Sequence, residues 1–196
     1  PKMRATLDVR EEQFEGRSVW HLAPKGRAPA GHLLFFHGGG YVFGAAAPHW
    51  TALAELAGKY GIAVTAPLYP LAPEAGVEET TGFALAYYRH YLESHAWPFA
   101  IGGDSAGAGL TSVTAMLARD AGLRLPSRIL LISPWLDAAA VDPAQPAIEP
   151  RDAMLRLRGI RDAGKLYART LPVSDWRVSP INGDWSGLPP ISLWTG

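Results

Sequence analysis

The 196-residue sequence contains no cysteine, no surplus of either charge and no long apolar run. Without cysteine, disulfides and thiolate metal sites are excluded. The 18 basic residues balance 18 acidic ones, and a formal charge of zero gives no reason to expect nucleic acid as a partner. No apolar run approaches the roughly 20 residues of a membrane span, so we expect no stable membrane insertion.

Two further classes of site and signal are missing from the sequence. His49, His90 and His95 do not stand at metal-ligand spacing, so no metal site is predicted. The opening residues 1–4 do not resemble a signal peptide, which favours a cytoplasmic location. What remains is a chain with 48% hydrophobic residues, which is enough for one well-packed domain spanning residues 1–196.

Short apolar runs and helix-like patterns alternate between Leu33 and Ile132. Apolar runs bounded by turn residues predict buried strands, at 33–36, 62–66, 97–101 and 129–132. Apolar residues at three- and four-residue spacing predict helices, at 48–60, 77–94 and 106–120. This alternation indicates an α/β fold with a mostly parallel sheet and helices on both faces. A β-hairpin formed by residues 4–10 and 17–23 is expected to precede it.

The regular alternation stops after Ile132. Prolines punctuate the next stretch, and only residues 151–170 have a helical pattern. We expect an insertion over about 136–178 that stands as a cap over one end of the sheet. Residues 191–195 then return to a strand pattern.

Residues 99–109 combine an apolar run, several glycines, a central serine and the start of a helical pattern. Within them, residues 103–107 fit G-x-S-x-G, the pattern of a nucleophile elbow. Strand and helix pass so close in such a turn that a side chain at either glycine would clash. The pattern alone is a weak signal in a chain with 21 glycines. We interpret Ser105 as the candidate catalytic nucleophile at the apex of the turn.

A second glycine motif, His37-Gly38-Gly39-Gly40-Tyr41, follows the first predicted parallel strand. It is either a flexible loop or a set of backbone N–H groups left free to bind an anion. Loops at the carboxyl ends of neighbouring parallel strands meet in one crevice, so this motif and Ser105 are expected to lie together. That arrangement suits acyl transfer. The predicted oxyanion-hole donors are the N–H groups of Gly38, Gly39 and Ala106.

These motifs together resemble the hormone-sensitive-lipase-like branch of the α/β-hydrolase superfamily. The resemblance runs from about residue 18 to the last residue and includes further segments, at residues 69–74, 133–137, 179–181 and 187–191. It implies a serine carboxylesterase or lipase that hydrolyses small-molecule esters with short to medium acyl chains, through an acyl-enzyme on Ser105 and without a cofactor. Tyr41 and Trp135 either line an acyl pocket under the cap or belong to the core.

All six histidines precede Ser105, whereas the resemblance implies the order Ser, Asp, His along the chain. The Asp and His of the triad are therefore expected beyond Gly196, together with the last strand and helix of the fold. We expect a fragment that shows little activity alone and that pairs as a homodimer or with a complementing C-terminal fragment. The alternatives are a degenerate homologue that binds a ligand without catalysis, or an amidase or formamidase on the same scaffold.

Overall fold

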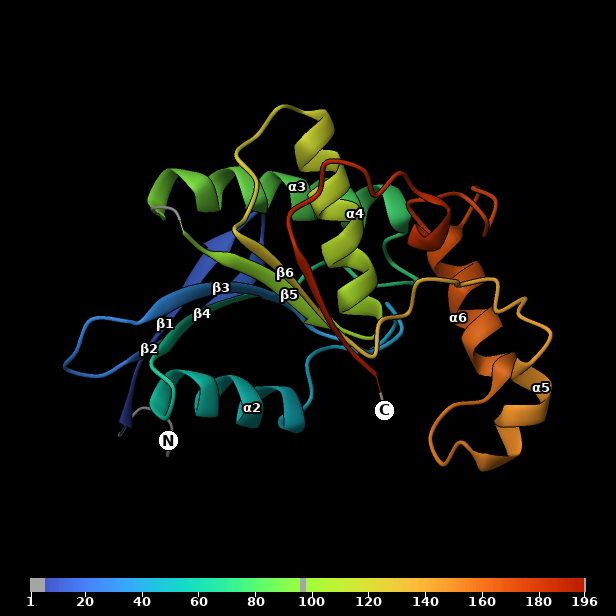
Figure 1. Ribbon diagram of the computed structural model, residues 1–196, viewed down its shortest axis with the longest axis horizontal. Helices are drawn as coiled ribbons and strands as arrows, with labels where there is room; N and C mark the ends of the chain where they lie inside the picture. Colours follow the sequence, from blue (N-terminus) through green and yellow to red (C-terminus); the bar gives the residue numbers. More distant parts are fainter. Residues whose placement is uncertain (1–5, 96–97, 196) are drawn as a thin grey trace.

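The computed structural model describes residues 6–95 and 98–195 (Figure 1). A seven-stranded sheet lies at the centre of this part of the chain, in the order β1-β2-β4-β3-β5-β6-β7. The strands are β1 (Leu7–Phe14), β2 (Arg17–Pro24), β3 (Gly31–Phe36), β4 (Ile62–Pro67), β5 (Ala100–Asp104), β6 (Arg128–Ile132) and β7 (Ile191–Trp194).

Strand directions divide the sheet into two parts. The hairpin β1–β2 is antiparallel, and β2 pairs antiparallel with β4. From β4 onward, through β3, β5, β6 and β7, every pairing is parallel. The α/β class, the mostly parallel sheet and the hairpin are thereby confirmed. The predicted residues 4 and 5 of the hairpin lie outside the described part of the chain.

Helices cover both faces of the sheet. Helix α2 (Ala47–Gly58) packs on β2 and β4, whereas α4 (Ala106–Asp120) packs on β3, β5 and β6 and also against α3 (Val77–Ser94). Figure 1 shows α2 on one side of the sheet and α3 with α4 on the other. Each face has its own buried apolar cluster. None of the helices within residues 6–95 and 98–195 is long and apolar enough to cross a bilayer.

The strand that leads to Ser105 differs from its predicted range of 97–101. It begins at Ala100 and continues to Asp104, and the predicted start at Trp97 lies outside the described residues. Gly102 and Gly103, which follow the predicted end of this strand, are strand residues in the structure. Gly102 pairs with Leu130 of β6. A β-carbon at Gly102 would lie 3.0 Å from the Leu130 side chain, so glycine here reflects close packing rather than a turn.

The predicted insertion falls within the segment between β6 and β7, and the helical part of that segment lies to one side of the sheet in Figure 1. The helix predicted over 151–170 is present, but it begins later than predicted, and shorter helical segments precede it. A short helix α5 (Gln145–Ile148) and a 3-10 turn η1 (Glu149–Arg151) come first, and α6 (Leu157–Ala168) follows. The Asp152 carboxylate accepts the N–H groups of Met154 and Leu155 at 2.8 Å each. Such local bonds compete with helical ones and delay the start of α6.

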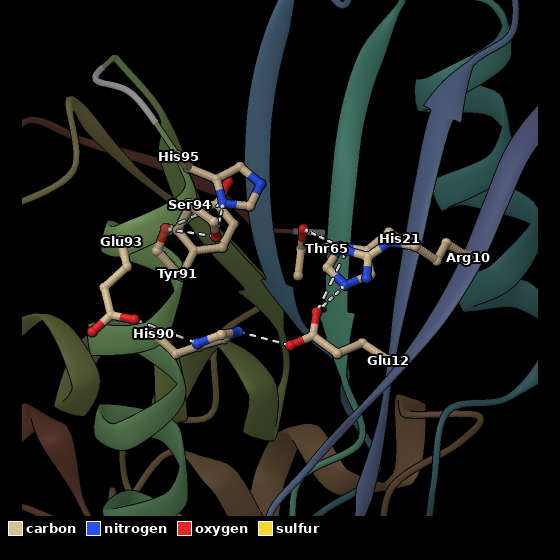
Figure 2. Close-up of polar contacts among 9 residues, drawn as sticks. All are labelled: Arg10, Glu12, His21, Thr65, His90, Tyr91, Glu93, Ser94 and His95. Atoms are coloured by element: carbon tan, nitrogen blue, oxygen red, sulfur yellow. Dashed lines mark hydrogen bonds and ion pairs between the residues drawn. The ribbon is translucent and has the colours of Figure 1, made fainter.

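One partly buried carboxylate ties the amino-terminal hairpin to α3. The Nε2 atoms of His21 and His90 lie 2.8 and 2.7 Å from the two oxygens of Glu12 (Figure 2). Burial opposes the charge of Glu12, but the two hydrogen bonds outweigh it and hold its pKa below the usual range. Burial also lowers the pKa of His21, and its bond to Glu12 offsets only part of that effect. His21 is therefore neutral at pH 7 and its Nδ1 accepts the Thr65 hydroxyl at 3.2 Å.

These pKa shifts predict that acid destabilises the fold. The unfolded chain protonates His21 from about pH 6.5 downward, whereas folded His21 resists protonation, so stability falls as the pH decreases through this range. The lowered pKa of Glu12 adds a loss in the same direction at more acidic pH. The free energy of unfolding, measured with urea between about pH 7.5 and 5.5, should therefore decrease, and His21→Gln should reduce the slope.

Lys25→Gln serves as the control, because Lys25 is exposed on the β2–β3 loop. It should leave the slope unchanged. A slope for His21→Gln equal to that of the unmodified chain would contradict the assignment of this pH dependence to His21.

Candidate active site

Ser105 stands alone between a strand and a helix. Strand β5 ends at Asp104 and α4 begins at Ala106, which leaves Ser105 with φ +49° and ψ −119°. A positive φ is strained for a residue with a β-carbon, and such strain is characteristic of functional turns. The Ser105 N–H donates to the Ile132 carbonyl at 2.9 Å, and its carbonyl accepts the Trp135 N–H at 3.0 Å. These bonds hold the backbone in the strained turn.

The glycines of the elbow are required by close approach of backbone to backbone. A β-carbon at Gly107 would overlap the carbonyl oxygens of Phe36 and His37. A β-carbon at Gly103 would overlap the carbonyl oxygens of Gly107 and Phe36. Backbone atoms cannot rotate away as side-chain ends do, so only glycine fits. The first turn of α4 and the end of β3 are thereby pressed together beside Ser105.

The glycine motif lies beside Ser105, as predicted. Strands β3 and β5 are parallel neighbours in which Phe36 pairs with Gly103, so Gly38 is at the level of Ser105. Gly39 has φ +128°, a conformation that residues with side chains rarely adopt. Its carbonyl accepts the N–H groups of Val42 and Phe43 at 3.1 and 2.9 Å. The motif is an ordered turn and not a flexible loop.

One of the three predicted oxyanion donors is wrong. The Gly38 N–H already donates to the Asp104 carboxylate, Oδ1, at 2.9 Å, so it is not available to an oxyanion. Within the part of the chain that the structure describes, the N–H groups of Gly39, Gly40 and Ala106 have no acceptor. The free donors are thus displaced by one residue along the loop from the predicted set. The sequence alone did not reveal this, because it does not show where the Asp104 side chain points.

His37 is the histidine closest in sequence to the glycine motif, and the structure gives it a local bond. Its Nδ1 lies 2.7 Å from the Gly38 carbonyl, and its ring stacks on Tyr69 with centroids 4.4 Å apart. Burial lowers the pKa of His37, so the ring is neutral and donates from Nδ1. Among residues 6–95 and 98–195, no histidine is hydrogen-bonded to the Ser105 hydroxyl. No group of three or more His, Asp or Glu side chains in these ranges could hold a metal ion.

Tyr41 and Trp135 belong to one aromatic cluster. The Tyr41 ring stacks on Tyr167 of α6 with centroids 3.7 Å apart and lies 5.8 Å from Trp135. Only 1% of Tyr41 is exposed, so its contacts are those of a core residue. A contribution of Tyr41 or Trp135 to acyl binding stays a prediction.

His49 also contacts the site, which the sequence analysis did not predict. It lies in the first turn of α2, and its Nε2 is 3.2 Å from Oδ2 of Asp104. The contact joins positions 49 and 104, which no sequence motif relates. The sequence contained one signal for this contact, the aspartate directly before the nucleophile. Its carboxylate needs hydrogen-bond donors nearby, and His49 is one of them.

Comparison with known proteins agrees with this geometry. The family described as alpha/beta hydrolase fold matches residues 33–196, and the chain belongs to this family. It is 34% identical over 166 residues to an acetyl-hydrolase of Streptomyces hygroscopicus, covering 84% of this chain and 56% of that protein. It is 32% identical over 193 residues to the carboxylesterase NlhH of Mycobacterium tuberculosis, covering 91% and 59% of the two chains.

The fold is also similar to solved structures. A hormone-sensitive lipase from a metagenome library matches with a TM-score of 0.89 at 28% identity, over 96% of this chain and 64% of that one. The resemblance to the hormone-sensitive-lipase-like branch is thereby confirmed. The chain spans less than two thirds of the length of each of these proteins.

The packing around the elbow predicts a large difference between two glycine substitutions. Gly107→Ala places a methyl group against backbone carbonyls and should lower the free energy of unfolding by about 3 kcal/mol, the upper part of the range for overpacking. Gly82→Ala, on an exposed face of α3 with nothing within 4 Å, should raise it by about 1 kcal/mol. Urea unfolding measures both. Equal effects of the two substitutions would refute the close approach at Gly107.

Proposed function

We propose that this chain carries the nucleophile and oxyanion hole of a serine hydrolase acting on carboxylic esters. One observation carries the proposal. Ser105 is held on a strained strand-to-helix turn beside the glycine loop. Within residues 6–95 and 98–195, the backbone N–H groups of Gly39, Gly40 and Ala106 have no acceptor. Donors preorganised in this way stabilise the negative charge that develops on a carbonyl oxygen during acyl transfer.

The proposed reaction begins when the Ser105 Oγ attacks the ester carbonyl carbon and the carbonyl electrons move onto oxygen. The N–H groups of Gly39, Gly40 and Ala106 donate to that oxyanion, and each such donor is worth roughly 3 kcal/mol of barrier. The positive end of the α4 dipole points at the same place. The oxyanion then collapses, the alcohol leaves with a proton, and the acyl group stays on Ser105. Water attacks this ester in turn and releases the acid and the free serine.

Substrate class is proposed from the relatives. Their names, acetyl-hydrolase and carboxylesterase, support esters of small carboxylic acids, in agreement with the predicted short to medium acyl chains. We place the substrate under the segment between β6 and β7 as a cap. Its helix α6 reaches the glycine loop, since a β-carbon at Gly40 would lie 3.9 Å from that of Ala163.

A serine hydroxyl needs a general base to react rapidly. The two histidines beside the elbow, His37 and His49, are both engaged elsewhere, His37 with the Gly38 carbonyl and His49 with Asp104. We therefore propose that the general base is the histidine of the Asp–His pair predicted beyond Gly196.

Reaction with a fluorophosphonate tests the nucleophile. The chain should be labelled at one residue, Ser105, and slowly, because an oxyanion hole without the base retains only about 10³- to 10⁴-fold acceleration. Ser105→Ala should abolish labelling, whereas Ser186→Ala, at an exposed serine far along the chain, should leave it unchanged. Mass spectrometry of the labelled peptide identifies the site. The absence of any label at Ser105 would count against acyl transfer and favour a ligand-binding homologue.

The same reasoning predicts little turnover of p-nitrophenyl acetate by the 196-residue chain alone. Loss of triad members lowers kcat by about 10⁴- to 10⁶-fold in a comparable serine hydrolase. Steady-state hydrolysis should therefore be barely above the Ser105→Ala background. Rapid, saturable hydrolysis by a chain whose intact mass ends at Gly196 would overturn the assignment of the base to residues outside it.

A further inference from the structure

The carboxylate next to the nucleophile is turned away from it. Asp104 is the last residue of β5, and its Oδ1 accepts the Gly38 N–H at 2.9 Å. Its Oδ2 lies 3.2 Å from Nε2 of His49. Both carboxylate oxygens are therefore used, one by the glycine loop and one by the first turn of α2. Neither bonds to Ser105, so Asp104 is not the acid partner of the nucleophile.

The hydrogen bonds of His49 determine its tautomer. The Ala46 N–H donates to Nδ1 of His49 at 2.9 Å, so Nδ1 carries no proton. The proton of the neutral ring is then on Nε2, where it donates to Asp104. Ala46 is also the residue that precedes α2. A single imidazole thus links the start of α2 to the carboxylate beside Ser105, with every polar atom of the ring satisfied.

This pair joins three segments that are distant in sequence. Gly38 follows β3, His49 begins α2, and Asp104 ends β5. A β-carbon at Gly38 would overlap Oδ2 of Asp104, which shows how closely the loop lies on the carboxylate. The two following residues, Gly39 and Gly40, carry the free N–H groups. Their position relative to Ser105 therefore depends on the anchor one residue earlier.

We propose that Asp104 and His49 are positioning residues that hold the glycine loop at a fixed place relative to Ser105. The inference rests on the proposed function, in which Gly39 and Gly40 bind the oxyanion. Asp104 does not touch the reacting atoms, and acts through Gly38. A displacement of about 1 Å in a reacting geometry costs on the order of 100-fold in rate, so a loose loop would be a poor oxyanion hole.

The pair also accounts for an aspartate rather than an asparagine at position 104. Two donors, the Gly38 N–H and the His49 Nε2–H, face the side chain, and only a carboxylate accepts both. An asparagine could accept from Gly38 but would turn its NH₂ group toward His49. The ring could not respond by moving its proton to Nδ1, because the Ala46 N–H faces that atom. Asp104→Asn should therefore keep one anchor and lose the other.

Amide hydrogen exchange, followed by NMR on the full 196-residue chain, tests the anchor directly and needs no activity. A hydrogen bond to a charged group is strong enough that its loss in Asp104→Ala should speed exchange at Gly38 by roughly tenfold to a hundredfold. Asp104→Asn and His49→Ala should give smaller increases. The matched control is Glu79→Ala, which removes an exposed carboxylate that accepts the Gly76 N–H at the start of α3. It should leave Gly38 unchanged.

The rate of labelling of Ser105 by a fluorophosphonate provides the second readout, which a purely structural role would not move. Asp104→Ala should lower it by roughly tenfold to a hundredfold, with Asp104→Asn in between and Glu79→Ala equal to the unmodified chain. Unfolding curves for each variant confirm that the reaction is measured on folded protein. If Asp104→Ala proves unstable, the Asp104→Asn and His49→Ala variants carry the comparison.

The outcomes separate this inference from the proposed function. Unchanged exchange at Gly38 in Asp104→Ala would overturn the inference, as would faster exchange with an unchanged labelling rate. Faster exchange together with slower labelling supports it. If exchange responds but Ser105 of the unmodified chain is never labelled, acyl transfer fails as the function, and the anchoring of the loop by Asp104 is upheld.

Discussion

The contact on which this structure depends is the close approach of two backbones beside Ser105. The first turn of α4 lies against the end of β3, with the carbonyls of Phe36 and His37 touching Gly107. That contact brings the loop after β3 to the level of the nucleophile. In the described part of the chain the N–H of Ala106, at the start of α4, has no acceptor, and neither do those of Gly39 and Gly40. The chemistry proposed for the site follows from how little room there is between these segments.

The parts of the fold set by local chemistry could be predicted from the sequence. Buried parallel strands are nearly continuous apolar runs, so β3, β4 and β6 can be predicted from the sequence. The spacing of apolar residues likewise predicts α2, α3 and α4. The errors fall where a tertiary or side-chain contact overrides the local pattern. The predicted strand ended at residue 101, before Gly102, because the packing of Gly102 against β6 cannot be recognised in the sequence. The late start of α6 follows from the side-chain bonds of Asp152.

The candidate site could also be predicted only in part. Ser105, Gly39 and Ala106 come from motifs whose spacing carries a backbone requirement. Gly38 was assigned the wrong role, and His49 was missed, because both depend on where the Asp104 side chain points. Direction of a side chain between two loops is set by the available donors and by space. Neither is encoded in a short stretch of sequence, so no pattern relates positions 38, 49 and 104.

The backbone of Ser105 has a cost that extends beyond the site. A non-glycine residue held in a sparsely populated conformation sacrifices on the order of 1–3 kcal/mol, a sizeable share of the 5–15 kcal/mol that keeps a typical domain folded. The two bonds that Ser105 makes with Ile132 and Trp135 hold this conformation but do not remove its strain. Glycine at this apex would adopt the same φ without that cost. Under the proposed function, the serine at this position lowers the folding free energy in return for reactivity.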